Sequence, residues 1–232
     1  MNTGRSRLPS LSAALAGIPA GVQTLGPWTG RRQLFVRFAV EAETATIYTS
    51  DALCAELARL AGRSRYHSVA IVGRDALAES EFLLATIEQT GPLAVMLDHD
   101  GQRPAALNGL LHALTLMQVT MDGSEGAAAV ERTCTSVELA ARKHVAHAVA
   151  IVPTDTLSDA SLLRIVEQVH EASADTQIVV HPTIDRPPEH DRRWVHWLQQ
   201  SMAVHADIRI LPRWPLTGRV ESAEQKAPQR AP

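Results

Sequence analysis

The chain has 232 residues, of which 45% are hydrophobic, and this is enough for one sizeable core in a single domain. Its 22 basic and 25 acidic side chains give a net charge of -3, so no basic excess favours binding to a nucleic-acid backbone. No apolar run reaches the roughly 20 residues of a membrane-spanning helix and no secretion signal is evident, so we expect a cytoplasmic protein with neither a nucleic-acid nor a membrane partner.

Six short apolar runs alternate with helical patterns along the chain. The runs predict strands at residues 34–39, 68–72, 93–97, 117–121, 148–152 and 177–180. Between them, apolar residues at three- and four-residue spacing predict helices, including one that starts at Ser50-Asp51 and one that starts at Ser158-Asp159, where polar side chains can cap the first turn. This alternation is typical of β/α units in a parallel sheet, and it fits both a partial (β/α)6 barrel and a doubly wound open sheet.

The composition changes near both ends of the chain. We expect residues 1–20 to form a partly ordered extension and residues 21–219 to form a single α/β domain. No apolar residue larger than alanine follows Val220, so we expect residues 220–232 to form a disordered tail.

One segment near the N-terminus carries the most specific pattern. Residues 23–31 read Q-T-L-G-P-W-T-G-R and residues 35–39 read F-V-R-F-A. Together they resemble the Q-G-E-G-P-x-x-G-R and F-V-R-x-A signature of the 7-carboxy-7-deazaguanine synthase family, whose members are radical S-adenosylmethionine (SAM) enzymes. In that family the signature runs into C-x-x-x-C-x-x-C, whose thiolates hold an iron–sulfur cluster. Counted on without a gap, the three cysteine positions hold Glu41, Ala45 and Tyr48.

Three later segments follow the family in the same order. The glycine-rich turn of the family, T-G-G-E-P-L-L-Q, meets SAM and corresponds to residues 72–79, where one of its two glycines is lost. Its E-T-N-G-T corresponds to residues 98–102, and its closing segment corresponds to residues 208–219, with Arg213 and Pro215 in place of glutamine and histidine. The resemblance implies a partial (β/α)6 barrel of the radical SAM type without the iron–sulfur cluster. The positions kept from the cofactor-binding motifs are Gly73, Asp75, Asp100 and Gly101.

Acidic and histidine side chains follow the expected strands, at the edge where functional residues of parallel β/α folds collect. We expect His99 and His181 to point into or near this mouth. A ring of carboxylates and imidazoles can bind a divalent metal, while aspartates at strand ends are equally typical of turns and helix caps. The two cysteines, Cys54 and Cys134, lie far apart without metal-binding spacing and are expected to be small buried side chains. The side chains of the ring are Glu41, Glu43, Asp75, Asp98, His99, Asp100, Asp122, Asp155 and His181.

Two functional hypotheses follow. The first is a cluster-less, radical SAM-like pseudoenzyme that binds a protein partner or a small-molecule ligand, for example within a biosynthetic assembly, and that could form a homodimer. The second is an enzyme that reuses the barrel mouth, with Asp98, His99, Asp122 and His181 binding a divalent metal or small ligand for hydrolytic or isomerising chemistry. Retained binding of SAM or a nucleotide as an unreactive signal is a third hypothesis.

Overall fold

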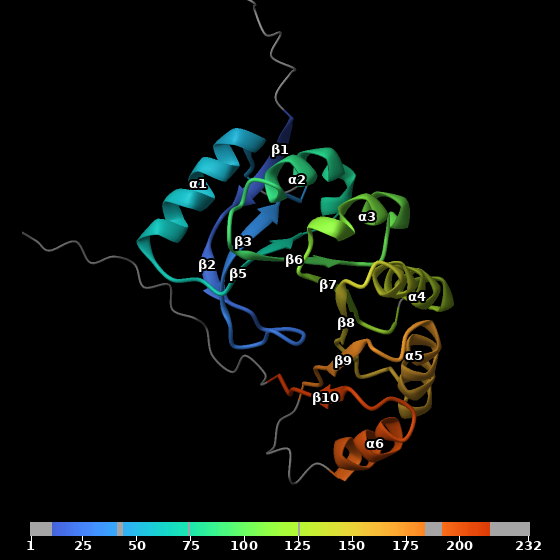
Figure 1. The fold of residues 1–232 in the computed structure, drawn as a ribbon. Helices are drawn as coiled ribbons and strands as arrows, with labels where there is room; N and C mark the ends of the chain where they lie inside the picture. The colour runs from blue at the N-terminus through green and yellow to red at the C-terminus, as the bar shows by residue number, and fades with distance from the viewer. Residues whose placement is uncertain (1–10, 41–43, 74, 125, 184–191, 214–232) are drawn as a thin grey trace, which may run out of the picture.

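The computed structural model describes residues 11–40, 44–73, 75–124, 126–183 and 192–213 (Figure 1). The strands within these residues form one sheet in the order β10-β9-β8-β7-β6-β5-β3-β1-β4, with β2 also paired to β3. They are β1 (Ser12–Gly17), β2 (Ala20–Val22), β3 (Arg32–Phe38), β4 (Thr46–Thr49), β5 (Ser68–Val72), β6 (Ala94–His99), β7 (Leu116–Met121), β8 (Ala146–Ile151), β9 (Gln177–Val180) and β10 (Ile208–Ile210).

Most of the sheet is parallel. The neighbouring strands β3, β5, β6, β7, β8, β9 and β10 run in the same direction. At one end of the sheet, β1 and β2 pair with β3 in the antiparallel sense, and β4 pairs with β1 in the same sense. Because no pairing among the described residues joins β4 to β10, the barrel is open.

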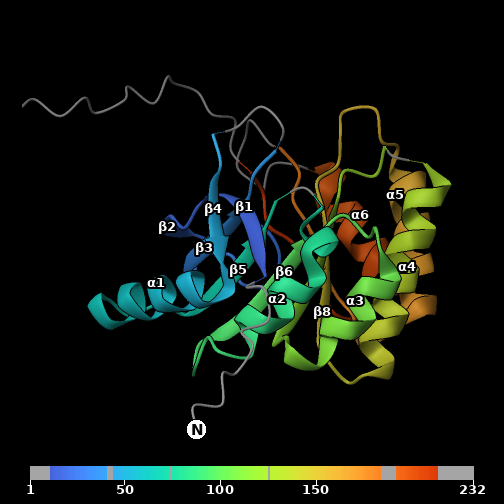
Figure 2. The same ribbon diagram turned by 90° about the horizontal axis from the view of Figure 1, so that it is seen from above.

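The helices lie in an arc along one face of the sheet, which both views show (Figures 1 and 2). Short 3-10 turns precede α2 and follow α3. The elements on this face are α1 (Ser50–Arg63), η1 (Ala76–Glu79), α2 (Ser80–Ile87), α3 (Pro104–Leu110), η2 (Leu111–Ala113), α4 (Ala127–Arg142), α5 (Asp159–Ala172) and α6 (Arg192–Met202).

The alternation of side chains along each strand separates two faces of the sheet. On β7, Met117 and Val119 pack into the core beneath the helices. Leu116 belongs to a small cluster on the other face, which Trp28 from the β2–β3 hairpin covers. Since the buried helix side chains belong to clusters on the first face alone, the arrangement is a partial barrel with outer helices and not a doubly wound sheet.

The six predicted strands are all present, as β3 and β5 to β9. Strand β1 comes from the expected N-terminal extension, and β2, β4 and β10 were not predicted. Ser158 caps α5 as expected, whereas the cap of α1 is Thr49, whose Oγ1 accepts from the N–H of Ala52 at 3.2 Å. None of the described helices has both the length and the apolar composition that a bilayer crossing requires. The expected disordered tail lies outside the described residues.

Candidate functional site

The connection between β2 and β3 covers the inner face of the sheet, opposite the helices (Figure 1). Its base is closed by a hydrogen bond from the N–H of Gln23 to the carbonyl of Arg31 at 2.9 Å. The Gln23 side chain is buried and lies 3.8 Å from the sulfur of Met96 on β6. Trp28 packs onto the same face and meets the ring of His67 edge-on at a centroid distance of 4.7 Å. The segment that carries the family-like motif is therefore packed inside the open barrel.

Gly26 is the point at which this hairpin meets the carboxyl ends of the strands. Its φ of +75° lies in the left-handed region, which favours glycine. A Cβ at this position would lie 1.8 Å from Oε1 of Gln118, so a side chain here would have to displace the buried amide end of Gln118. The Gly26 N–H donates to Nε2 of His181 at 2.8 Å. Glycine at this position thus allows both the left-handed turn and the close contact with Gln118.

His181 follows β9 and is 1% exposed. Because the Gly26 N–H can only donate, Nε2 of His181 accepts, and Nδ1 carries the proton that is donated to the carbonyl of Leu211 at 3.0 Å. Burial lowers the pKa of His181 below its ordinary value, with a further lowering by the charge of Arg213, against a raising effect of the Leu211 hydrogen bond. The uncharged imidazole joins the hairpin, the end of β9 and the segment after β10.

A polar group lies on the inner face beside this junction. The Thr120 hydroxyl donates to Oδ1 of Asp98 at 2.6 Å, and Nε2 of Gln118 donates to Oγ1 of Thr120 at 3.2 Å. Asp98 and Thr120 keep partial exposure, while Oε1 of Gln118 is buried and has no partner among the described residues. Burial raises the pKa of Asp98 to about 6, although hydrogen bonds from Thr120 and Gln118 oppose the shift. We call Asp98, Gln118 and Thr120 the inner polar group.

The inner polar group can bind a ligand and can exchange a proton. The partly exposed carboxyl group of Asp98 supplies acceptors for N–H or O–H donors of a ligand. A carboxyl group with a pKa of about 6 changes its charge close to neutral pH, which suits binding as well as general acid–base chemistry.

His99 does not point into the mouth, contrary to our expectation. Strand β6 extends to His99, so Asp98 and His99 lie on opposite faces of the sheet. The His99 ring is buried against Met117, with Nε2 3.3 Å from its sulfur, in the core beneath the helices. Its Nδ1 accepts from the N–H of Gly101 at 3.2 Å, and burial lowers its pKa to about 4. His99 is a core side chain.

The other aspartates of the expected ring have structural contacts of their own. Oδ1 of Asp122 accepts from the N–H of Ser124 at 2.7 Å, which is a turn hydrogen bond. Oδ1 of Asp100 accepts in the same way from the N–H of Gln102 at 3.1 Å. Asp155 is exposed, and Glu41 and Glu43 lie outside the described residues.

The turn after β5 is occupied by contacts within the chain. Asp75 forms a two-pronged ion pair with Arg103, with Nη2 at 2.7 Å from Oδ2, and this pairing lowers the pKa of Asp75. Gly73 has φ +114°, and a Cβ there would lie 2.8 Å from the carbonyl oxygen of Phe38. The retained glycine therefore allows two segments of this chain to pack closely.

The described residues contain no group of three or more histidine, cysteine or carboxylate side chains arranged to hold a metal ion. Both cysteines are partly buried between helices and not at the mouth. The thiol of Cys54 on α1 donates to the carbonyl of Thr86 and that of Cys134 on α4 to the carbonyl of Gln168, each at 3.5 Å. Burial raises the pKa of the Cys134 thiol to about 11.

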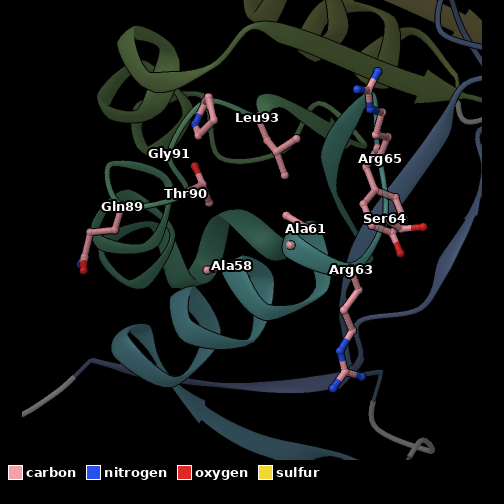
Figure 3. A pocket seen from close by; sticks show the side chains of 12 residues that line it. Ala58, Ala61, Arg63, Ser64, Arg65, Gln89, Thr90, Gly91 and Leu93 are labelled. Carbon is pink, nitrogen blue, oxygen red and sulfur yellow. The ribbon is translucent and has the colours of Figure 1, made fainter.

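A pocket of about 720 Å³ lies at the opposite, amino-terminal edge of the strands (Figure 3). The end of α1 and the loop before β6 form its walls, with Ala61 and Leu93 among the lining residues. The side chains of Arg63 and Arg65 extend in opposite directions in Figure 3, so they do not converge on one anion. These two cations therefore do not form an anion-binding pair in this pocket.

Sequence reasoning placed Asp98 at the mouth but missed its partners Gln118 and Thr120. A signal was present, because residues 117–121 read M-Q-V-T-M, with polar residues at alternate positions of an apolar strand. Nothing in the sequence indicated that His181 accepts a hydrogen bond from the backbone of Gly26, since the two residues lie 155 positions apart.

No protein-family model matches the sequence, and no curated protein matches it. Among solved structures, the crystal structure of QueE from Escherichia coli is similar, with a TM-score of 0.50 and 14% sequence identity. The similarity covers 87% of this chain and 94% of that chain. QueE is a 7-carboxy-7-deazaguanine synthase, a radical SAM enzyme. At this identity the likeness concerns the fold, which is radical SAM-like.

Proposed function

We propose that the chain is a cluster-less pseudoenzyme of radical SAM-like fold that binds a small polar ligand or a protein partner without radical chemistry. The observation that carries this proposal is the number and the location of the cysteine residues. The cluster of a radical SAM enzyme takes three cysteines, whereas this chain has two, and both lie between helices.

The segment aligned with the cluster-binding loop supports the same proposal. Ala45 precedes β4, and Tyr48 lies within it, opposite Ala13 in the ladder between β4 and β1. Neither an alanine methyl nor a tyrosine ring of an edge strand can replace a thiolate ligand of iron. The backbone of Thr46–Thr49 pairs with β1 in the sheet.

The inner polar group supplies the proposed binding capacity. Asp98 and Thr120 are partly exposed and mutually oriented by a 2.6 Å hydrogen bond, and the buried Gln118 amide donates to Thr120 at 3.2 Å. Donor groups of a ligand, or of a partner in a biosynthetic assembly, can pair with the carboxyl oxygens of Asp98. Binding of a ligand or of a protein partner is proposed on this basis.

The test is a SAM cleavage assay after anaerobic treatment with iron, sulfide and a strong reductant. We expect no 5′-deoxyadenosine above the level of the Cys54→Ser/Cys134→Ser double variant, which removes iron held adventitiously by thiols. Cleavage that depends on protein and exceeds this control would overturn the proposal. Calorimetric titration with SAM in the absence of iron tests separately whether the fold still binds it as a signal.

A metal-dependent or acid–base enzyme at the mouth is the second candidate, favoured by the partly exposed Asp98 with its pKa of about 6. His99 faces away from such a site, and His181 already has hydrogen-bond partners at both ring nitrogens. Stoichiometric zinc or manganese that is lost in Asp98→Asn and kept in Asp207→Asn, at the opposite edge of the sheet, would favour this candidate.

A further inference from the structure

We propose that His170 and His205 form a binding site for a single divalent transition-metal ion of the class that favours imidazole, such as Zn²⁺. The site lies outside the mouth and is independent of the function proposed above. Its starting observation is that the Nδ1 atoms of the two rings face one another at 3.1 Å.

The orientation of His205 is fixed by the protein. Its side chain is fully buried, and Nε2 donates to the carbonyl oxygen of Thr176 at 2.6 Å. With the proton on Nε2, the lone pair of Nδ1 points towards His170. A ring N–H donated to a backbone carbonyl is the usual second contact of a metal-ligating histidine, because it sets the tautomer and the direction of the ligand atom.

His170 supplies the second nitrogen and the access route. It lies in the last turn of α5 and is partly exposed, whereas His205 is enclosed. Without metal, the two facing nitrogens require one proton between them, which His170 donates from Nδ1. If that proton moves to Nε2 of His170, two lone pairs face each other, and a cation is needed to make this arrangement favourable. The tautomer change releases no net proton.

The distance suits this replacement. A tetrahedral ion with Zn–N bonds of about 2.05 Å separates two nitrogen ligands by about 3.3 Å, close to the 3.1 Å between the two Nδ1 atoms. The rings are nearly perpendicular, at 82° with centroids 5.3 Å apart, so they are not stacked on one another. Because a tetrahedral ion lies beside the line that joins its two nitrogen ligands, the partly exposed His170 ring has to turn until its Nδ1 points to the ion and no longer directly at His205.

The described residues offer no third side-chain ligand, so two or more positions on the ion remain for water or an external ligand. Such an open site has the composition of a regulatory or exchangeable metal site and not that of a closed structural one. It joins the end of α5 to the segment after α6, on which His205 lies.

The test uses the untagged full-length protein and Zn²⁺ as the probe. Isothermal titration should give one saturable site that is lost in His170→Ala and kept in His112→Ala, whose histidine is exposed and pairs only weakly with Glu88 at 3.9 Å. Since His170 is partly exposed, this variant is expected to fold, and its circular dichroism and melting curve check that it does.

Nitrogen-15 NMR of the histidine rings gives a readout that needs no variant. Zn²⁺ should shift the Nδ1 resonances of His170 and His205 together, while the His205 Nε2–H signal persists. Equal binding by wild type and His170→Ala, or titration without a change at these two Nδ1 atoms, would overturn the proposal. Neither result bears on the cluster-less proposal, which concerns iron and the barrel mouth.

Discussion

The imidazole of His181 accepts a hydrogen bond from the backbone of Gly26 at 2.8 Å and thereby holds the β2–β3 hairpin against the carboxyl ends of the parallel strands. The other ring nitrogen donates to Leu211, so one buried side chain joins three segments that are distant in sequence. The hairpin that carries the family-like motif is thus part of the packed inner face, and the inner polar group lies next to it.

Gly26→Ala should be strongly destabilising. Its Cβ would lie 1.8 Å from Gln118 Oε1, and alanine is also strained at the φ of +75°. Gly30→Ala is the matched control, because φ is +85° but nothing lies within 4 Å of the added Cβ. Urea unfolding should show a loss at Gly26 that exceeds the loss at Gly30 by about 2 kcal/mol or more. Equal losses would mean that backbone strain alone, without the contact with the Gln118 amide, accounts for the cost of replacing Gly26.

His181→Ala should release the hairpin locally. The substitution leaves the Gly26 N–H without its acceptor, at a cost of about 1–3 kcal/mol if the N–H stays buried. We expect the Gly26 amide to lose protection in hydrogen–deuterium exchange, with amides of β7 and β8 affected much less. Protection at Gly26 that matches wild type would show that the hairpin does not depend on this hydrogen bond.

Acid should destabilise the fold through its buried histidines. Burial lowers the pKa of His99 to about 4 and also lowers that of His181, so between pH 6.5 and these lower values the unfolded chain binds more protons than the folded chain. Their contribution is fully present above pH 6.5 and is lost as the pH falls. His99→Gln should reduce the loss of unfolding free energy between pH 7.5 and 4.5 by on the order of 2 kcal/mol. His112→Gln, at an exposed position, should leave it unchanged, and an identical pH dependence in His99→Gln would contradict the assignment.

Asp98→Asn should stabilise the protein at alkaline pH and not at acid pH. The pKa of Asp98 is raised to about 6, so the folded state disfavours the ionised carboxylate, and an amide that still accepts from Thr120 removes this cost. We expect a gain of about 1–3 kcal/mol at pH 8 that shrinks as the pH falls through 6 towards 4. A loss of stability at pH 8 would mean that the charged carboxylate is held by interactions stronger than the cost of its burial.

The sequence predicted the parallel part of the fold because its strands are continuous apolar runs, which buried parallel strands require. It did not predict β1, since Ser12–Gly17 is rich in alanine and becomes a strand only through pairing with β3 and β4. The error at His99 arose from the end of one strand: two more residues in β6 place Asp98 and His99 on opposite faces.

Of the candidate site, Asp98 and the turn glycines were accessible to sequence reasoning. Their hydrogen-bond partners could not be predicted. Asp98 contacts Thr120 of a neighbouring strand, and Gly26 contacts His181, which follows a strand near the far end of the sheet. Such pairings depend on strand order and register, which no local pattern specifies.

Iron content is the most direct test of the absence of a cluster. The protein should be purified without oxygen and without a histidine tag, supplied with iron and sulfide, desalted and analysed for metal. We predict iron well below one atom per chain, and Cys54→Ser/Cys134→Ser should remove no more than the part of it that thiols hold adventitiously. Iron near four atoms per chain, with the absorbance and redox behaviour of an iron–sulfur cluster, would contradict the account.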